Sequence, residues 1–426
     1  MIDKTLYQSY INILREELVP AMGCTEPIAV AYCAALARKT LGCLPKSVEV
    51  LASGNIIKNV KSAVVPNTGG RRGIATAAAA GIVAGREDAE LQVLAEVTTD
   101  QKAEIAEYLE SATFDVRESD RPYVFDIQVS VFSEEHSAYV EIAGQHTNVI
   151  CIEKDGISLF KKDYEEQGDS SETDRSLLTV EKIVEFADTV NIEDVRDILK
   201  KQIDCNTAIA EEGLHGNYGA NIGRILLQAY GDSVHNRAKA YAAAGSDARM
   251  NGCELPVVIN SGSGNQGLTT SLPVIVYAKE LNVSEDKLYR ALVVSNLVTI
   301  HMKTGIGRLS AYCGATSAGC GAGAGVTYLY GGGYREIAHT IVNAVAIDSG
   351  MICDGAKASC AAKIASAVEA GLLGMQMQMH GSQFYSGDGI VVKGVENTIL
   401  NVGKLAREGM HETDRTILEM MTGNRG

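Results

Sequence analysis

The segment KKDYEEQGDSSETDRS, residues 161–176, separates two parts of the sequence that differ in pattern. It is highly charged and has no aliphatic residue between Phe160 and Leu177, as is typical of an exposed linker. At 426 residues, the chain exceeds the roughly 250–300 residues at which a single hydrophobic core stops growing. We therefore expect two or more domains, with a boundary at this segment.

Residues 46–165, before and at the start of this segment, predict a small module with a mixed α/β sheet. They contain three runs in which apolar and polar residues alternate, the period of half-buried β-strands: FDIQVSVF (125–132), SAYVEIAG (137–144) and TNVICIE (147–153). A further strand is expected at 91–97 and a helix at 100–112.

The rest of the chain predicts mainly helices. Residues 4–41 indicate two helices joined by a Gly-Cys-Thr-Glu-Pro turn, because Pro27 suits the first turn of the second helix. We expect these N-terminal helices, within residues 1–45, to pack on a mainly helical catalytic domain formed by residues 177–426. The predicted fold class is therefore α+β and multidomain, with a largely helical domain and the small sheet module.

Charge and composition exclude some classes of function. The 38 Lys and Arg residues against 53 Asp and Glu residues give a net charge of −15. Nucleic-acid binding is not expected, because neutralising phosphates requires clustered basic residues. The longest uncharged stretch, 309–334, is too rich in glycine for a membrane span, and the polar N-terminal residues do not resemble a signal peptide. We expect a cytoplasmic protein that handles a small molecule and forms a homodimer, as large enzymes often do.

The ten cysteines permit two interpretations. In a reducing compartment most cysteines are small, buried core residues without disulfides. Cys313, Cys353 and Cys360, however, have small neighbours that would let backbone N–H groups approach the sulfides of an iron–sulfur cluster. Cys320 is a rival member of this set. The C-x6-C spacing in CGATSAGC and CDGAKASC leaves both interpretations open.

Two turns could bind or activate a substrate. In GCTEP, residues 23–27, either the following helix favours a Cys24 thiolate, or Thr25 simply serves as the N-cap. In INSGSGNQGLTTSLPV, residues 259–274, a glycine-rich turn leads into an apolar helix. Free N–H groups at such a junction could bind a substrate carboxylate, and a plain turn is the alternative.

Six motifs in order resemble the L-cysteine desulfidase (CyuA-like) family, formerly an uncharacterised protein family: GCTEPIAVAY, SGNIIKNV, PNTGGRRGI, SGSGNQG, GRLSAYCGA and CDGAKASC. The resemblance runs nearly from end to end. The sequence is more distantly similar to iron–sulfur L-serine dehydratases, whose helical catalytic domain carries a comparable glycine-rich loop and three separated cluster cysteines.

The resemblance implies a [4Fe–4S] enzyme that converts L-cysteine to pyruvate, ammonia and sulfide without pyridoxal phosphate. Cys313, Cys353 and Cys360 resemble the three cluster ligands of the family, with Cys320 as a rival. Cys24 resembles its N-terminal functional cysteine, either the catalytic base or a fourth ligand. The expected substrate-binding residues come from three turns: Thr25, Asn67, Ser261, Gly264, Asn265, Gln266 and Gly267.

The expected reaction is a β-elimination. Because the Cα proton of an amino acid is too weakly acidic for a side-chain base alone, a Lewis acid must polarise the substrate carboxylate. Two other functions remain open at this point. One is an L-serine dehydratase-type ammonia-lyase, which differs only in the leaving group, and the other is a non-catalytic iron–sulfur redox or binding protein.

Overall fold

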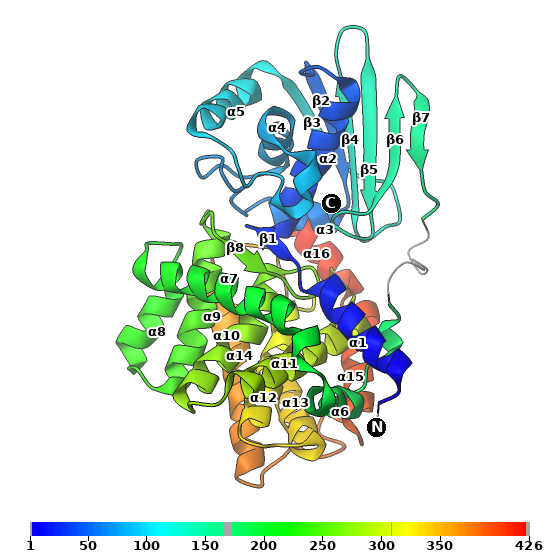
Figure 1. The fold of residues 1–426 in the computed structure, drawn as a ribbon. Coiled ribbons are helices and arrows are strands. Elements are labelled where there is room, and N and C mark those ends of the chain that lie inside the picture. Colours follow the sequence, from blue (N-terminus) through cyan, green and yellow to red (C-terminus); the bar gives the residue numbers. More distant parts are fainter. Residues whose placement is uncertain (1, 165–172, 308, 423–426) are drawn as a thin grey trace.

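The computed structural model describes residues 2–164, 173–307 and 309–422. Figure 1 shows a sheet module in the upper part of the view and a helical domain in the lower part. The α+β, multidomain fold class is confirmed. The predicted linker falls mainly on residues 165–172, which lie outside the described residues, and the domain boundaries at 46, 165 and 177 stay a prediction.

The sheet module contains six strands in the order β3-β2-β4-β5-β6-β7. Their bounds are β2 Ser47–Ala52, β3 Thr113–Glu118, β4 Asp126–Phe132, β5 Ser137–Ala143, β6 Val149–Lys154 and β7 Ile157–Lys161. Strands β2 and β3 are parallel and the other pairs are antiparallel. The three strands predicted from alternation are confirmed as β4, β5 and β6. The two edge strands lack a buried face, so alternation did not reveal them.

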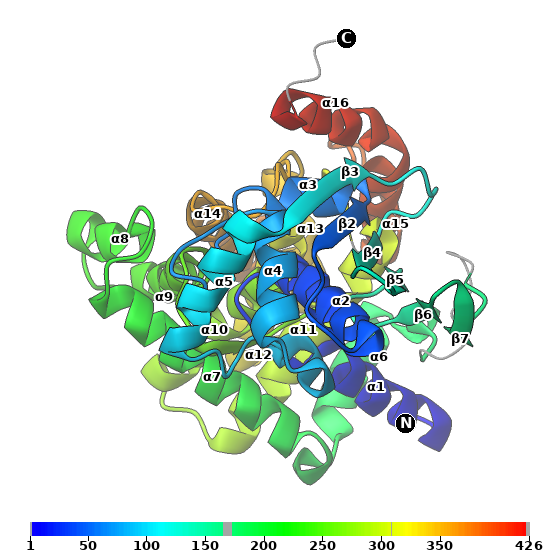
Figure 2. The ribbon, with the colours of Figure 1, turned by 90° about the horizontal axis from the view of Figure 1, so that it is seen from above.

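Three helices cover one side of the sheet, as the view from above shows (Figure 2): α2 (Thr25–Leu41), α4 (Ile74–Ala84) and α5 (Thr99–Ser111). Helix α2 lies between α4 and strands β4 and β5 and is buried on nearly every side. The expectation that both N-terminal helices pack on the helical domain is therefore wrong for α2. Its all-round apolar surface requires a layer on each side. Helix α1 (Lys4–Glu17) does pack on that domain, where Tyr10 meets Phe186 edge-to-face.

The strand expected at 91–97 is wrong. The chain there forms a 3-10 helix, Glu87–Gln92, followed by turns in which the Arg86 N–H donates to the Val93 carbonyl. Leu91 and Leu94 are nevertheless buried, so the apolar residues of this segment indicate burial and not a β-strand. The helix expected at 100–112 is confirmed as α5.

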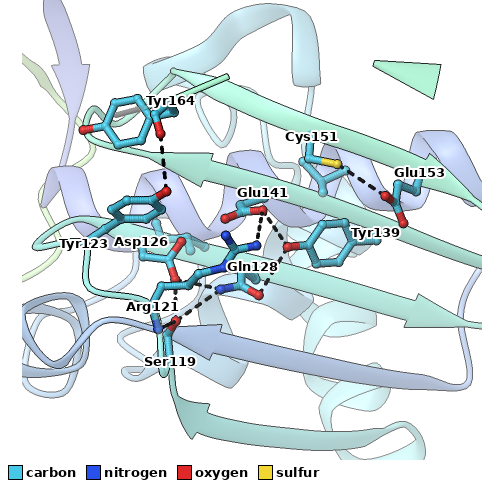
Figure 3. A network of polar contacts seen from close by, with 12 residues as sticks. Ser119, Arg121, Tyr123, Asp126, Gln128, Tyr139, Glu141, Cys151, Glu153 and Tyr164 are labelled. Atoms are coloured by element: carbon cyan, nitrogen blue, oxygen red, sulfur yellow. Dashed lines mark hydrogen bonds and ion pairs between the residues drawn. The ribbon is translucent and has the colours of Figure 1, made fainter. Parts of the chain in front are cut away.

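The sheet face opposite α2 carries a polar network (Figure 3). Glu141 accepts hydrogen bonds from the Tyr139 hydroxyl at 2.8 Å and from Arg121 Nη2 at 3.3 Å. Asp126 Oδ2 accepts one from Gln128 Nε2 at 2.7 Å. Burial raises the pKa of both carboxyls. These contacts give partners to polar groups on the face that the three helices do not cover.

The helical domain is built from the remaining long helices: α6 Val180–Thr189, α7 Arg196–His215, α8 Ile222–Tyr230, α9 Val234–Met250, α10 Gly264–Glu280, α11 Glu285–Ile306, α12 Gly314–Leu329, α13 Tyr334–Asp348, α14 Cys360–Met379, α15 Val395–Lys404 and α16 His411–Thr422. A short α3, Gly54–Val60, contacts α16. Within the described ranges, no helix is both long and apolar enough to cross a bilayer.

A two-stranded antiparallel ladder joins the N-terminal segment to the helical domain. Strand β1 (Pro20–Met22) pairs with β8 (Pro256–Val258), so that Ala21 lies opposite Val257. Each strand is followed closely by a turn that the sequence analysis singled out, GCTEP after β1 and the glycine-rich 259–267 turn after β8. Because the ladder is antiparallel, the two turns leave it at opposite ends, and the Thr25 hydroxyl joins them by donating to the Gly262 carbonyl at 3.0 Å.

Candidate active site

A cavity of about 100 Å³ lies where four helices begin. Cys24 is the N-cap of α2, Cys313 is the N-cap of α12, and Cys360 is the first residue of α14. Gln266 lies in the first turn of α10 and also lines the cavity. Because a helix N-terminus carries a partial positive charge, these four ends create surroundings that favour anions, including thiolates.

Glycines place the ends of α12 and α14 side by side. Gly319 lies against Ala367, and Gly323 lies against Gly371, so the two helices run in the same direction. A β-carbon on Gly323 would lie only 2.8 Å from the carbonyl carbon of Gly371. This close approach explains part of the glycine content of the sequence, and it sets Cys313 and Cys360 at neighbouring helix ends.

The structure brings together the three predicted cluster cysteines. The Cys313 N–H donates to the Met351 carbonyl at 3.1 Å, and the Cys353 N–H donates to the Ala311 carbonyl at 2.6 Å, which joins the two cysteine-bearing loops. All three cysteines line the cavity, and Cys360 also packs against Cys24. Cys24 is thus the fourth thiol at this place.

Lysine charges and a hydrogen bond act on the thiols of the two loops. The hydrogen bond from Cys313 lowers the pKa of Cys353 to about 6, and the charges on Lys58 and Lys303 act in the same direction. The same hydrogen bond, together with burial, raises the pKa of Cys313. Burial raises the pKa of Cys360. The arrangement therefore favours a thiolate at Cys353 first.

The rival Cys320 lies elsewhere. It is 2 % exposed inside α12, and it does not line the cavity. Burial raises the pKa of its thiol well above the ordinary value, as expected for a core cysteine. Cys320 is therefore a buried core cysteine, which was the first of the two interpretations of the cysteines.

The GCTEP turn differs from both interpretations offered by the sequence. Cys24, not Thr25, is the N-cap of α2. The Cys24 thiol donates to Glu26 Oε2 at 3.2 Å, and both burial and the negative charge of Glu26 raise its pKa well above the ordinary value. Burial and the Glu26 carboxylate therefore oppose the thiolate that the helix N-terminus would favour at Cys24, and the role of Cys24 stays a prediction.

Glu26 itself is the centre of a buried hydrogen-bond network. Besides the Cys24 thiol, its carboxylate accepts from the Thr25 hydroxyl at 3.1 Å and from Asn59 Nδ2 at 3.0 Å. Burial alone would raise the pKa of Glu26, but the charge of His146 and the Cys24 hydrogen bond outweigh it and lower the pKa. Glu26 is therefore an ionised carboxylate in the wall of the cavity.

Several polar atoms around the cavity have no hydrogen-bond partner among the described residues: Arg249 Nε, Asn265 Oδ1, Gln266 Oε1 and the Tyr312 hydroxyl. Buried polar groups in proteins are nearly always satisfied, so each exception calls for an explanation. Four exceptions around one cavity indicate a site shaped for a polar ligand.

Five of the predicted substrate-binding residues do not line the cavity: Thr25, Asn67, Ser261, Gly264 and Gly267. Some of them support the walls of the cavity, and others lie away from it. The Thr25 hydroxyl donates to the Gly262 carbonyl at 3.0 Å and so ties α2 to the 259–267 turn. Asn67 Nδ2 donates to the Leu94 carbonyl at 2.7 Å. Of the predicted set, only Asn265 and Gln266 line the cavity.

Sequence reasoning missed several residues of the site. Arg249, Asn59 and Lys363 line the cavity. Asn59 lies within SGNIIKNV and Lys363 three residues after CDGAKASC, whereas Arg249 lies in helical sequence outside the motifs. Tyr312 directly precedes Cys313, and Glu26 lies within GCTEP, so their position in motifs was the available signal. Glu26 was interpreted only as a helix-opening acid.

The donor set fits an iron–sulfur cluster better than a single ion. Within the described residues, no three His, Cys, Asp or Glu side chains converge closely enough to hold one metal ion. A [4Fe–4S] cluster has its irons at separate corners, so its thiolate ligands surround a volume rather than a point. Three thiols around a cavity rich in helix N-termini meet that requirement.

Comparison with protein families matches residues 88–419 to the serine dehydratase alpha chain. The chain belongs to this family. Membership indicates a lyase of the ammonia-lyase type. The matched residues cover strands β3 to β7 and most of the helical domain, including Cys313, Cys353 and Cys360, whereas Cys24 and Glu26 lie before them.

Individual relatives extend the likeness to the whole chain. A UPF0597 protein from Desulfitobacterium hafniense is 61% identical over 97% of this chain and 96% of its own length. UPF0597 proteins from Lachnoclostridium phytofermentans and Treponema denticola are 51% and 46% identical, and the matches cover at least 98% of this chain. These names state no activity.

Proposed function

We propose that this protein is an iron–sulfur-dependent lyase that converts L-cysteine and water to pyruvate, ammonia and sulfide. One observation carries the proposal. Cys24, Cys313, Cys353 and Cys360 come from distant parts of the sequence and line a single cavity that also contains unpartnered polar atoms.

In this proposal Cys313, Cys353 and Cys360 hold a [4Fe–4S] cluster. When bound, such a cluster supplies a Lewis-acidic iron that polarises the substrate carboxylate and takes up leaving-group charge. The positive charges of Lys58 and Lys303 favour thiolates in this wall of the cavity. Pyridoxal phosphate has no part in the reaction proposed here.

Cys24 is the proposed base. Its proton lies on Sγ in the conformation described, 3.2 Å from Glu26 Oε2. Burial and the charge of Glu26 oppose the thiolate, whereas the charge of Arg249 favours it; as a thiolate, Cys24 can take the Cα proton of the substrate. The hydrogen bonds that Glu26 accepts from Thr25 and Asn59 hold its carboxylate in place beside Cys24.

Elimination then follows from the position of the substrate. The Cα–H electron pair forms a Cα–Cβ double bond, and sulfide leaves from Cβ. The released aminoacrylate is hydrolysed to pyruvate and ammonia. Asn265 and Gln266 are the proposed polar contacts that orient the substrate, because both have an unpartnered oxygen at the cavity.

L-serine is the second candidate substrate, and the family match favours it. The same proton abstraction would apply, with hydroxide instead of sulfide as the leaving group. The cytoplasmic location and the homodimer stay predictions.

The test is anaerobic reconstitution with iron and sulfide, followed by two assays on one sample. Sulfide release from L-cysteine supports the desulfidase, and pyruvate from L-serine alone supports the dehydratase. A cluster spectrum without turnover of either substrate would favour a non-catalytic redox or binding protein. Cys24→Ala should keep its iron and lose turnover; a fully active variant contradicts the role of Cys24.

A further inference from the structure

Arg249 has an unusual position for an arginine. It lies in the last turn of α9 and is only 2 % exposed, yet its Nε has no hydrogen-bond partner. Across residues 2–164, 173–307 and 309–422, no carboxylate forms an ion pair with its guanidinium. Because burying a charge without a partner is costly, such a group is normally retained for a ligand.

The guanidinium faces the cavity of the candidate active site. Arg249 lines that cavity together with Cys24 and Glu26, and its positive charge acts on the pKa of both. A β-carbon on Gly264 would lie 2.8 Å from Arg249 Cζ, so the glycine at this position provides the space for the guanidinium. The chain is therefore shaped around the side chain of Arg249.

The other cations at the cavity are engaged. Lys363 Nζ donates to the Ile352 carbonyl at 2.7 Å and also pairs with Asp354. Lys303, which also lines the cavity, has an interaction partner as well, so among the described cations of the lining Arg249 has donor groups to spare for a ligand. Its planar fork matches a carboxylate in two parallel hydrogen bonds, a geometry that lysine does not offer.

Glu26 supplies the complementary charge. It is an ionised carboxylate in the same cavity, and no ion pair joins it to Arg249 within the described part of the chain. Its carboxylate accepts from Cys24, Thr25 and Asn59, and the charge of His146 also acts on it. The two charges form a site for a zwitterion.

We propose that Arg249 binds the α-carboxylate of the substrate while Glu26 faces its α-ammonium, so that the site selects free α-amino acids over their amides and amines. This inference rests on the proposed amino-acid lyase function and names its specificity-determining residue. A substrate whose carboxylate is blocked would leave the guanidinium buried and unpaired, which is how a polar site rejects an analogue.

The test measures binding of compounds that have no leaving group. Equilibrium dialysis with anaerobically reconstituted protein compares L-alanine with L-alaninamide. The native protein should bind L-alanine about 10- to 100-fold more tightly, the range expected for a charged hydrogen bond. In Arg249→Met this ratio should fall to about 1, while iron content stays unchanged. Arg249→Lys should give an intermediate ratio, and it serves as the test if the Met variant does not fold.

Arg290→Met is the matched control, because Arg290 bonds Asp286 and the Ala187 carbonyl away from the cavity. It should keep the native ratio. A native ratio near 1, or an Arg249→Met variant that retains the native ratio, would overturn the inference. If the native protein discriminates as expected but turns over neither cysteine nor serine, the lyase proposal fails and the role of Arg249 stands.

Discussion

The ion pair between Lys58 and Asp414 gives the sharpest stability prediction. It joins α3, which lies beside the cysteine-bearing 353–360 loop, to the C-terminal helix α16. The Lys58 side chain is 2 % exposed and the Asp414 side chain is 20 % exposed. The two single substitutions should therefore have unequal costs.

Asp414→Ala leaves a buried ammonium group without its partner. Breaking a buried pair in this way costs about 3–5 kcal/mol, and partial water access to Asp414 places the expected loss near the lower end, about 3 kcal/mol. Lys58→Met removes the buried charge and leaves a carboxylate that water can reach, so its cost should be about 1 kcal/mol. The double variant should resemble Lys58→Met, which gives a coupling energy of about 3 kcal/mol in magnitude.

Urea unfolding at pH 7 and hydrogen exchange of α16 measure these effects. Lys61→Met is the control: exposed Lys61 bonds the Met421 carbonyl of α16, and its replacement should cost less than about 0.5 kcal/mol. The reasoning is refuted if Asp414→Ala is no more destabilising than Lys58→Met, or if the coupling energy is near zero.

Three further predictions concern the site and its surroundings. Cys360→Ser should lose most of the reconstituted iron while Cys320→Ser keeps it, measured by iron analysis; equal iron content in both contradicts the ligand assignment. Gly314→Ala should raise KM several-fold with little change in iron content, because its β-carbon would lie 2.7 Å from Gln266 Cδ; an unchanged KM contradicts a role for Gln266. Burial raises the pKa of Asp247 to about 6, so the folded state holds a proton that the unfolded chain releases near pH 4, and native stability falls as pH rises through about 6. Asp247→Asn should therefore gain about 3 kcal/mol at pH 8 and about half of that at pH 5 in urea unfolding, and an equal effect at both pH values would contradict the shift.

The elements with strong periodicity were predictable from the sequence. Strands β4 and β5 alternate cleanly because one face packs on α2, and Pro27 marked the start of that helix. The position of α2 was not predictable, since an apolar helix does not reveal which layers enclose it. The strand prediction for residues 91–97 was wrong for a related reason. The Leu residues of this segment are buried in the core, but a 3-10 helix and turns place them there instead of a strand.

The candidate site divides in the same way. The motifs pointed to Cys24 and to the three cysteines of the C-terminal half, because these residues stand in distinctive local sequence. Arg249 carries no local signal: it belongs to the site only because Gly264 opens space for its guanidinium. Thr25 and Gly264 do lie in the motifs that were singled out, but they do not line the cavity. Thr25 bonds the Gly262 carbonyl and Gly264 makes room for Arg249, and only the contacts in the structure reveal these roles.

The position of Cys24 depends on contacts between the two parts of the molecule. Its helix, α2, has most of its length in the sheet module, whereas the other three thiols belong to the helical domain. Two local ties hold the start of α2 at the cavity: the β1–β8 ladder and the Thr25 hydrogen bond to the Gly262 carbonyl. Because proton transfer requires the base within hydrogen-bond reach of its substrate, a small shift of α2 along its axis would separate base from substrate. The N-terminal segment is therefore an integral wall of the site, and the short ladder fixes its register.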